Sequence, residues 1–383
     1  MAGKRISRRV LTGGPCSGKT LGLAMLSKRL PGFGVKPFFV PELATLVGGS
    51  GFTLDNTGFD KRYNYEFQKN MLMAQLALED HWMRFAELDP APNKVLICDR
   101  GGMDNEGYIE VELFRQILRE LFLNPLDLLD KRYDSVHHMA TAADGAEEFY
   151  NLDNPARYEK TLEEARERDR RTLAAWVGHE HLRIIGNYEI VAGAKRQIGF
   201  DAKLDRLLKD VCLGLGIPAP YEIERRFLVA LDTDLALLPE TATEVNIIQT
   251  YLLSRGDVQR RIRERLYGGS ALYVYTEKKR VKAGVREEEE RIIDACEYRA
   301  LLRERDPKRR DVVKWRHSFV WEQQYFQLDE VNAPMPIFLL EIELTEERQE
   351  ILLPPFIKVI KEVTDDTRYG NGSIAAGTCP GYE

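Results

Sequence analysis

Residues 13–20 read Gly13-Gly14-Pro15-Cys16-Ser17-Gly18-Lys19-Thr20 and match the phosphate-binding pattern G-x-x-x-x-G-K-[ST]. An apolar, strand-like segment ends just before them, and an apolar, helix-like segment opens just after them. Backbone N–H groups at such a strand-to-helix turn converge on phosphate oxygens. We therefore predict that this octet binds a nucleoside polyphosphate, with Lys19 on the outer phosphates and Thr20 on Mg²⁺. An ordinary glycine-rich turn is the alternative, which the full pattern disfavours.

The composition indicates a two-domain protein of the globular class. The chain has 383 residues, which is longer than the usual size of a domain built around a single hydrophobic core. A net charge of −6 argues against general nucleic-acid binding. The five cysteines lack the spacing of a zinc site, which indicates a reducing compartment. No apolar run reaches about 18 residues, so we predict no membrane span and a cytoplasmic location.

The N-terminal half alternates short apolar runs with long helical patterns. Residues 37–40 and 95–98 indicate buried strands, whereas 65–88 and 111–129 indicate helices. This alternation predicts an α/β domain with a mostly parallel sheet flanked by helices. The expected segments are a P-loop nucleotide-binding domain at 1–213, a Gly- and Pro-rich linker at 214–220, a second domain at 221–366 and a flexible tail at 367–383.

Three further side chains are candidates for the nucleotide site. Asp99 ends an apolar run, as does the strand-end carboxylate that organises Mg²⁺ opposite a P-loop, and Arg100 follows it. This Asp-Arg pair resembles that of nucleoside and nucleotide kinases, in which an acidic residue after the second strand receives a hydroxyl proton. Glu42 has such a position. The alternative for Glu42 is a carboxylate in the first turn of a helix, where the macrodipole favours it.

A charged helical segment offers a second group of cations. Its arginines are candidates for a lid over the phosphates or, alternatively, for a solvated helix face: Arg166, Arg168, Arg170 and Arg171. The guanine-reading pattern N-K-x-D is missing, because Asn93-Lys94-Val95 is followed by Leu96. The choice between ATP and GTP therefore stays open.

After Pro220 the pattern changes to short strands separated by turns. The expected strands are 222–229, 247–253, 260–266, 272–281, 288–293, 312–320, 325–329 and 337–344. Such a series predicts an antiparallel barrel or sandwich. The fold class expected for the chain is thus an α/β P-loop domain followed by an antiparallel β-barrel.

Paired charges recur in these strands at a spacing of two, which places each pair on one face of its strand. The pairs are Glu222, Glu224 and Arg226; Arg261, Arg263 and Arg265; Lys278 and Arg280; Lys314 and Arg316; and Glu341 and Glu343. For a single strand, a charged face that is exposed to water explains the pattern. For five strands together, a barrel with a charged lumen explains it better. Such a lumen suits a polyphosphate, because the cations neutralise phosphate oxygens and the carboxylates bind Mg²⁺ or Mn²⁺.

The segment Glu222-Ile223-Glu224-Arg225-Arg226 resembles the ExExK signature of the CYTH, or triphosphate tunnel metalloenzyme, superfamily. Lys314-Trp315-Arg316 and Glu341-Ile342-Glu343 match the family in order. The resemblance implies an eight-stranded antiparallel tunnel that binds triphosphate with a divalent metal. It implies that Glu222, Glu224, Glu341 and Glu343 are metal ligands and that Arg226 contacts phosphate. The acidic run also offers Glu288 and Glu290, by their alternation.

One departure from the signature bears on catalysis. Its lysine is replaced by Arg226, which presents a planar fork of donors in place of a compact ammonium. The replacement keeps the positive charge that binds phosphate and changes the donor geometry on which turnover depends. We expect a metal-dependent triphosphate phosphohydrolase or nucleoside triphosphatase, and the residues leave open whether the tunnel hydrolyses its ligand.

The N-terminal half is similar to the P-loop ATPase family related to the nicotinamide-riboside kinase domain of NadR. A P-loop domain of this type fused to a CYTH domain implies GTP binding, phosphoinositide binding and a role in vesicular trafficking, with attachment to endomembranes. Two alternatives to the hydrolase therefore stay open. One is a non-catalytic regulator that binds GTP and phosphoinositide headgroups, and the other is a kinase for a nucleoside or riboside that uses Lys19, Asp99 and Glu42.

Overall fold

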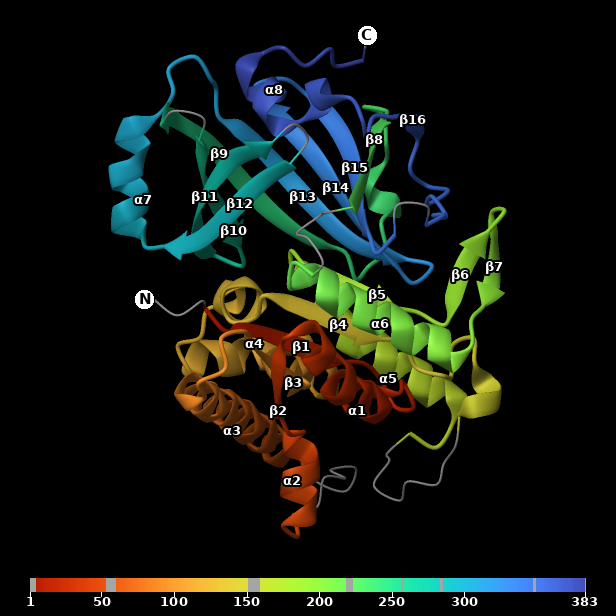
Figure 1. Cartoon of the computed structure of the whole chain (residues 1–383). Coiled ribbons are helices and arrows are strands. Elements are labelled where there is room, and N and C mark those ends of the chain that lie inside the picture. The colour runs from red at the N-terminus through yellow and green to blue at the C-terminus, as the bar shows by residue number, and fades with distance from the viewer. Residues whose placement is uncertain are drawn as a thin grey trace. The chain divides into compact units, whose positions relative to one another are not determined.

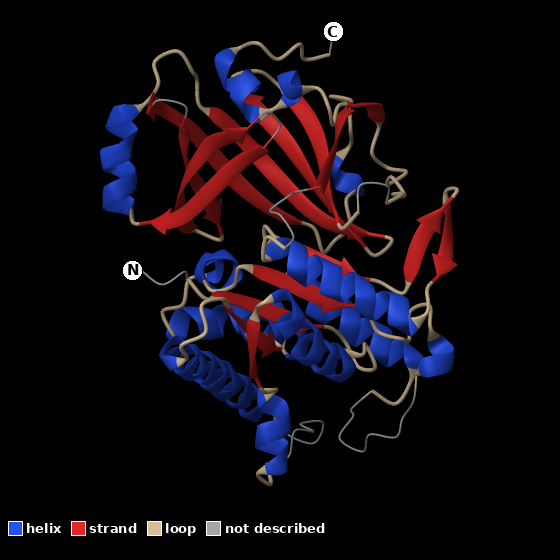
Figure 2. Cartoon of the chain, in the orientation of Figure 1, coloured by secondary structure: helices blue, strands red, loops and turns tan. Residues whose placement is uncertain are grey.

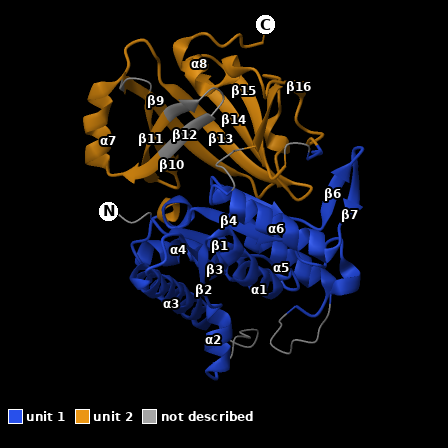
Figure 3. Cartoon of the chain, viewed as in Figure 1, with its two compact units in different colours: residues 1–124, 128–221, 348–352 blue, residues 125–127, 222–347, 353–383 orange. Residues whose placement is uncertain are grey.

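The computed structural model describes residues 5–52, 60–150, 159–217, 223–255, 258–282, 285–346 and 349–382. The chain divides into two compact units (Figure 3). The first comprises residues 1–124, 128–221 and 348–352, and the second comprises residues 125–127, 222–347 and 353–383. Each unit is considered separately below.

The first unit is built on a five-stranded parallel sheet (Figure 1). Its strands are β1 (Ser7–Thr12), β2 (Lys36–Val40), β3 (Lys94–Asp99), β4 (Ser135–Met139) and β5 (Leu182–Ile185). They lie in the order β2-β3-β1-β4-β5, and every neighbouring pair is parallel. The predicted α/β class is therefore confirmed. In a sheet of this kind, ligands bind beyond the carboxyl ends of the strands.

Helices flank this sheet (Figure 2). They are α1 (Lys19–Arg29), α2 (Leu43–Gly49), α3 (Lys61–Leu88), α4 (Val111–Glu120), α5 (Leu162–Ala174) and α6 (Phe200–Gly214). Leu26 of α1 and Leu207 of α6 pack with Leu11 and Ile97 in one buried cluster on the sheet. The helix α3 begins where the Asp60 carboxylate accepts a hydrogen bond from the Tyr63 amide at 2.7 Å. None of the helices in the described ranges is long and apolar enough to cross a membrane.

Strand β4 was not expected from the sequence. Its five residues, Ser135 to Met139, are all buried, yet two of them are histidines. His137 Nδ1 lies 2.8 Å from an Asp210 oxygen, and His138 Nε2 lies 3.1 Å from an Asp169 oxygen. Because both partners are remote in sequence, no local pattern indicates that these polar residues belong to a buried strand. A small hairpin of β6 (Tyr188–Val191) and β7 (Ala194–Gln197) follows β5.

The second unit is a nine-stranded antiparallel sheet in the order β12-β11-β10-β9-β13-β14-β15-β8-β16 (Figure 1). The strands are β8 (Ile223–Val229), β9 (Thr243–Arg255), β10 (Val258–Tyr267), β11 (Ser270–Lys282), β12 (Val285–Ile293), β13 (Val312–Trp321), β14 (Gln324–Ala333), β15 (Ile337–Leu344) and β16 (Val359–Glu362). All eight expected strands are present, and β16 is an additional edge strand. The predicted antiparallel class of this half is confirmed. Two short helices, α7 (Ala295–Leu301) and α8 (Asn371–Ala376), complete the unit.

The C-terminal segment differs from the flexible tail expected at 367–383. Tyr369 and Ile374 are fully buried and pack with Leu228 and Leu339 of the sheet. The Tyr382 hydroxyl donates to the Val229 carbonyl at 2.9 Å. The Gly-rich composition suggested mobility, but three large apolar or aromatic side chains within it anchor the segment to the sheet.

Candidate functional site

The octet forms the turn between β1 and α1, as the sequence predicts. Gly13 has a φ of 141° and Gly18 a φ of 91°, a region that residues with a side chain rarely adopt. A Cβ atom at Gly13 would lie 2.1 Å from the Met139 carbonyl oxygen, and one at Gly18 would lie 2.6 Å from the Phe200 ring. Both glycines are thus required by backbone conformation and by close packing.

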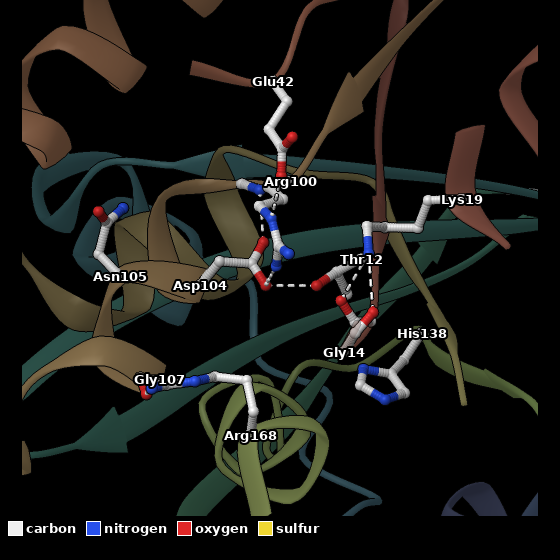
Figure 4. Close-up of polar contacts among 12 residues, drawn as sticks. Thr12, Gly14, Lys19, Glu42, Arg100, Asp104, Asn105, Gly107, His138 and Arg168 are labelled. Atoms are coloured by element: carbon white, nitrogen blue, oxygen red, sulfur yellow. Dashed lines mark hydrogen bonds and ion pairs between the residues drawn. The ribbon is translucent and has the colours of Figure 1, made fainter. Parts of the chain in front are cut away.

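Lys19 lies over this loop (Figure 4). Its Nζ atom donates to the carbonyl oxygens of Gly13 and Gly14 at 2.8 and 3.0 Å and to Ser17 Oγ at 3.2 Å. Burial lowers the pKa of Lys19 to about 8, and the nearby Arg100 adds to the effect. The ammonium is therefore held at the place where a P-loop receives phosphate oxygens.

The other predicted residues of this site lie at the carboxyl ends of β2 and β3. Burial raises the pKa of Asp99 to about 6, and its Oδ1 atom is buried without a hydrogen-bond partner among the described residues. Arg100 has a positive φ of 70° and donates from Nε to Glu42 Oε1 at 2.7 Å (Figure 4). Burial opposes ionisation of Glu42, but Arg100 outweighs it and holds the pKa of Glu42 at about 2.

A cavity of about 1160 Å³ contains these groups. One part of it is lined by the last six residues of the octet, Pro15 to Thr20, together with Glu42, Asp99 and Arg100. A second part is lined by aromatic and amide side chains, namely Phe67, Gln68, Gln75, Asn105 and Tyr108. The volume is at the upper end of what single small-molecule ligands occupy, about 300–1,000 Å³. The cavity therefore has room for a nucleotide.

Two residues that the sequence did not indicate support the loop from behind. The Gly14 amide donates to Asp169 Oδ1 of α5 at 2.6 Å, and His138 Nε2 lies 3.1 Å from the same oxygen. Asp169 is only 8% exposed. Burial opposes its ionisation, yet His138 and the Gly14 amide lower the pKa of Asp169 below its usual value. The carboxylate thus ties the phosphate loop to α5 and β4.

Asp169→Asn is expected to lower the free energy of unfolding by about 1–3 kcal/mol at pH 7, because two buried contacts lose their charge. A carboxylate whose pKa is lower in the folded state than in the unfolded state, where it is about 3.9, stabilises the fold at pH values above about 3.9. This stabilisation is lost as the pH falls through the pKa of the folded state. The gap between variant and wild type should therefore shrink below about pH 4. Urea unfolding at pH 7 and below about pH 4 measures this difference in the free energy of unfolding. Glu167→Gln, on an exposed position of α5, is the control, and equal losses in both variants would contradict the assignment.

Lys203 and Asn187 also lie in the cavity wall and were not predicted. Lys203 Nζ donates to the Ala140 carbonyl at 2.6 Å and to Asn187 Oδ1 at 2.8 Å. Burial lowers the pKa of Lys203 to about 7. Its position in the amphipathic helix α6 offered no signal, because this helix carries several charged residues and the sequence does not show which of them are buried.

The four arginines considered for a lid do not line the cavity within the described part of the chain. Arg170 pairs with Glu167 on the same helix, and Arg166 pairs with Glu147 and Glu163. Arg168 lies over the Tyr108 ring at 4.4 Å and pairs with Glu159. It also donates to the Gly107 carbonyl, toward which it points in Figure 4. Arg171 donates to the Ile109 carbonyl at 2.7 Å. These contacts favour the alternative of a helix face held by local pairs.

In the second unit, a set of charged side chains shares one face of the sheet. We call the following residues the charged face: Glu224, Arg226, Arg261, Arg263, Arg265, Lys278, Lys314, Arg316, Asp329, Glu341 and Glu343. Lys314 is 3% exposed, Arg265 is 2% exposed and Glu341 is 9% exposed. Such burial of charge is costly unless the charges are paired. This burial distinguishes the face from a sheet surface in water.

Asp329 is the centre of one group of pairs, and the sequence analysis missed it. Arg316 donates from Nε and Nη2 to its two oxygens at 2.6 and 2.8 Å, and Lys314 donates to the same carboxylate. Burial opposes ionisation of Asp329, but these two cations hold its pKa well below the usual range. The residues two positions away from Asp329 in β14 are Gln327 and Val331, which are uncharged, so the pattern of paired charges does not mark Asp329.

The acidic residues of β8 and β15 lie beside arginines. Arg226 donates to Glu224 at 2.8 Å and to Glu341 at 2.7 Å, and Arg316 donates to Glu341 at 2.8 Å. Glu343 lies directly opposite Glu224 in the β8–β15 ladder. Burial, together with the nearby Glu341, raises the pKa of Glu224 to about 8. The predicted carboxylates are therefore gathered, but arginines occupy their oxygens.

Only some of the remaining predicted residues lie in the part of the chain that the structure describes. Arg263 Nη2 donates to Glu290 at 2.6 Å. Arg261 and Lys278 are half-buried. Glu222 lies outside the described residues, and so do the side chains of Arg280 and Glu288.

Two sites for a divalent metal were expected, and their oxygen donors differ in how well they suit a metal ion. In the first unit the unpartnered Asp99 Oδ1 and the Thr20 hydroxyl are hard oxygen donors beside the P-loop, which suits Mg²⁺. In the second unit both oxygens of Glu341 accept from guanidinium groups. Among the residues that the structure describes, no group of three or more His, Cys, Asp or Glu side chains is arranged to hold a metal ion. The carboxylates of the charged face, as placed, do not fit a metal.

The fold and the site define the class of protein. One chain combines a P-loop nucleotide-binding domain with a large antiparallel sheet, and one face of that sheet carries buried charges. Residues 8–189 match the family model described as an AAA domain. This part of the chain is thus similar to P-loop domains of the AAA type. The comparison with curated proteins gave no match.

Solved structures similar to the chain include one described as an inorganic triphosphatase. The inorganic triphosphatase NE1496 is 31% identical, with 41% of this chain and 95% of that chain covered and a TM-score of 0.31. A structure described as the hypothetical protein NE1496 is 32% identical, covering 41% and 98%, with a TM-score of 0.31. The PH1819 protein from Pyrococcus horikoshii OT3 is 24% identical, covering 33% and 80%, with a TM-score of 0.27.

Proposed function

We propose that the chain binds a nucleoside triphosphate with Mg²⁺ in its first unit and a triphosphate anion on the charged face of its second unit. The observation that carries the proposal is the octet itself, with Lys19 over the loop and Asp99 Oδ1 unpartnered in the same cavity. Lys19 would bind the outer phosphates, and Thr20 and Asp99 would hold the metal, which neutralises phosphate charge. Titration with ATP and GTP, with and without Mg²⁺, tests this, and no Mg²⁺-dependent binding of either would refute it.

The buried cations of the charged face support binding of the anion in the second unit. Arg263, Lys314 and Arg316 are donors that neutralise phosphate oxygens in a site of low dielectric. We further propose that this unit releases phosphate from its ligand, and that Mg²⁺ or Mn²⁺ would arrive bound to the triphosphate, since the carboxylates as placed do not fit a metal by themselves. Tripolyphosphate is a suitable probe, since NE1496 is described as an inorganic triphosphatase. Glu222→Ala together with Glu224→Ala should abolish metal-dependent phosphate release, and wild-type turnover in this double variant would contradict the proposal.

A small-molecule kinase is the second candidate, favoured by the part of the cavity lined by Phe67, Gln68, Asn105 and Tyr108. Glu42 and Arg100 line the same cavity as this part and the phosphate loop, so a hydroxyl bound there would lie in the cavity that receives the phosphates. Glu42 stays ionised because of Arg100 and would orient that hydroxyl. Transfer of labelled phosphate from ATP to a panel of nucleosides and ribosides, lost in Lys19→Ala, would support the kinase. No labelled product would count against it.

A non-catalytic regulator is the third candidate. A P-loop domain followed by a CYTH domain resembles the fly protein named for a defect in translocation of the TRPL channel, which implies GTP and phosphoinositide binding. The pairing of Arg226 with both Glu224 and Glu341 favours a receptor for phosphate groups over an enzyme. Binding of a phosphoinositide headgroup without release of phosphate would support it, whereas rapid multiple turnover of tripolyphosphate would exclude it.

A further inference from the structure

The turn that follows β3 holds Arg100 in a backbone conformation that an arginine rarely adopts. Its φ of 70° lies in the left-handed region, and a residue with a side chain stays there only where the surrounding structure holds it. The Arg100 carbonyl accepts from Gln75 Nε2 at 3.3 Å, and the Gly102 amide donates to the Tyr133 hydroxyl at 2.7 Å. Gln75 belongs to α3, and Tyr133 lies just before β4. Side chains from outside the turn therefore hold it.

One buried carboxylate contacts both of these side chains. Glu79 of α3 is fully buried and accepts from Gln75 Nε2 at 2.9 Å and from the Tyr133 hydroxyl at 2.9 and 3.0 Å. It also accepts from Arg132 Nε at 2.7 Å, and Arg8 Nη1 lies 3.6 Å from its Oε2 atom. Burial raises the pKa of Glu79, and Arg132 opposes this shift. All of these neighbours are donors, so the carboxylate accepts from each of them.

An ionised carboxylate only accepts hydrogen bonds, so it fixes the direction of the groups around it. The Tyr133 hydroxyl turns its proton toward Glu79 and keeps a lone pair for the Gly102 amide. The Gln75 amide turns its NH₂ group toward Glu79 and toward the Arg100 carbonyl. A donor at position 79 would reverse these directions, and the turn would then face a proton or an oxygen of the wrong kind. Because buried polar groups that lose their partners are costly, the turn would have to move.

The guanidinium group of Arg100 has a donor to spare in the cavity of the phosphate loop. Its Nε atom donates to Glu42 at 2.7 Å (Figure 4), whereas Nη1 is buried without a hydrogen-bond partner among the described residues. Asp104 Oδ1 lies 3.9 Å from Nη1, which is beyond hydrogen-bond distance. Buried donors are nearly always satisfied, so this one indicates that a ligand supplies the acceptor. A phosphate oxygen of the nucleotide is such an acceptor.

We infer that Glu79 is a positioning residue of the nucleotide site, which acts through Gln75 and Tyr133 on Arg100. Gln75 and Glu79 are four residues apart on α3 and therefore lie on one face of the helix. Gln75 and Arg100 line the cavity, whereas Glu79 lies behind them and does not line it. Glu79 holds the turn so that Arg100 Nη1 meets a phosphate oxygen. The inference rests on the nucleotide binding proposed for the first unit and names a residue that sets its affinity.

A double-mutant cycle on the full chain tests the inference, with dissociation constants for MgATP and MgGTP as the measurement. Glu79→Gln keeps the shape of the side chain but places a donor in the cluster, and we expect it to weaken nucleotide binding about tenfold. In the Arg100→Gln protein, Glu79→Gln should have no further effect, because the group that it positions is gone. Purely structural damage would weaken binding by the same factor with and without Arg100, and that result would overturn the inference. Absence of nucleotide binding by the wild type would overturn the proposed function.

The ionisation of Glu42 gives a second measurement, which needs no nucleotide. Burial opposes ionisation of Glu42, but Arg100 outweighs it and holds the pKa of Glu42 at about 2. Displacement of Arg100 in Glu79→Gln should therefore raise the pKa of Glu42 toward its usual value of about 4.3. Carbon NMR of labelled glutamate carboxyl groups follows the titration, and Glu42→Gln identifies the signal. An unchanged pKa of Glu42 in folded Glu79→Gln protein would overturn the inference, whether or not a nucleotide binds.

Asp80→Asn is the matched control for Glu79→Gln. Asp80 is the next residue on α3 and accepts from the same two arginines, from Arg8 at 3.1 Å and from Arg132 at 2.9 Å. Its substitution should leave the nucleotide affinity and the pKa of Glu42 unchanged, and losses equal to those in Glu79→Gln would contradict the inference. Tyr133→Phe serves if Glu79→Gln does not fold, because it removes only the hydroxyl that accepts from the Gly102 amide. It should weaken nucleotide binding only where Arg100 is present.

Discussion

Lys19→Ala should weaken binding of MgATP or MgGTP about 100-fold, since charged hydrogen bonds contribute about 1.5–3 kcal/mol and every 1.4 kcal/mol is tenfold in affinity. The ammonium lies over the loop on three oxygens of the octet itself, so its loss removes the main cation at the phosphate position. A dissociation constant from fluorescent nucleotide titration measures the change.

The control for this variant is Lys28→Ala. Lys28 lies in the same helix, α1, but is exposed in its last turn. Its removal changes net charge by the same amount without touching the loop. Should both variants bind nucleotide equally well, the octet would not be the nucleotide site.

Arg263→Gln should weaken binding of tripolyphosphate about 10- to 100-fold and leave nucleotide binding unchanged. Arg263 is 9% exposed and belongs to the charged face, where it donates to Glu290. A buried guanidinium that meets a phosphate is more effective than one in water, because the surrounding dielectric is low. Isothermal titration in the Lys19→Ala background isolates this site.

Arg260→Gln is the matched control for Arg263. Arg260 lies on the opposite face of β10, is 2% exposed, and pairs with Tyr275 at 2.7 Å and with Glu304 at 2.6 Å. Its loss should lower the free energy of unfolding but keep the affinity for tripolyphosphate. A larger loss of affinity in Arg260→Gln than in Arg263→Gln would mean that the ligand binds on the other face.

Local patterns were sufficient for much of this architecture. The octet, with apolar residues on either side, identified the β1–α1 turn, because the phosphate loop is continuous in sequence. Alternation with a period of two identified eight of the nine strands of the second unit, since each long antiparallel strand carries its own pattern. The same period marked the charges of Arg263, Lys314 and Glu341, which lie on one buried face.

The residues that sequence reasoning missed depend on partners far away in the chain. His138 and Asp169 are 31 residues apart, and each looks like an ordinary polar residue until the fold joins them. Asp329 has no charged residue two positions away in β14, and its partners Lys314 and Arg316 belong to another strand, so no local pattern indicates its role. The order of the C-terminal segment was missed because Tyr369 and Ile374 are anchored by β8 and β15, not by their neighbours.

The most direct test of two separate phosphate sites is a set of dissociation constants for MgATP or MgGTP and for tripolyphosphate with Mn²⁺. These are measured for wild type, Lys19→Ala, Arg263→Gln and the double variant. We expect Lys19→Ala to lose nucleotide but keep tripolyphosphate, Arg263→Gln to do the reverse, and the double variant to lose both. Loss of both ligands in either single variant would contradict the account, because it would place nucleotide and triphosphate in one site.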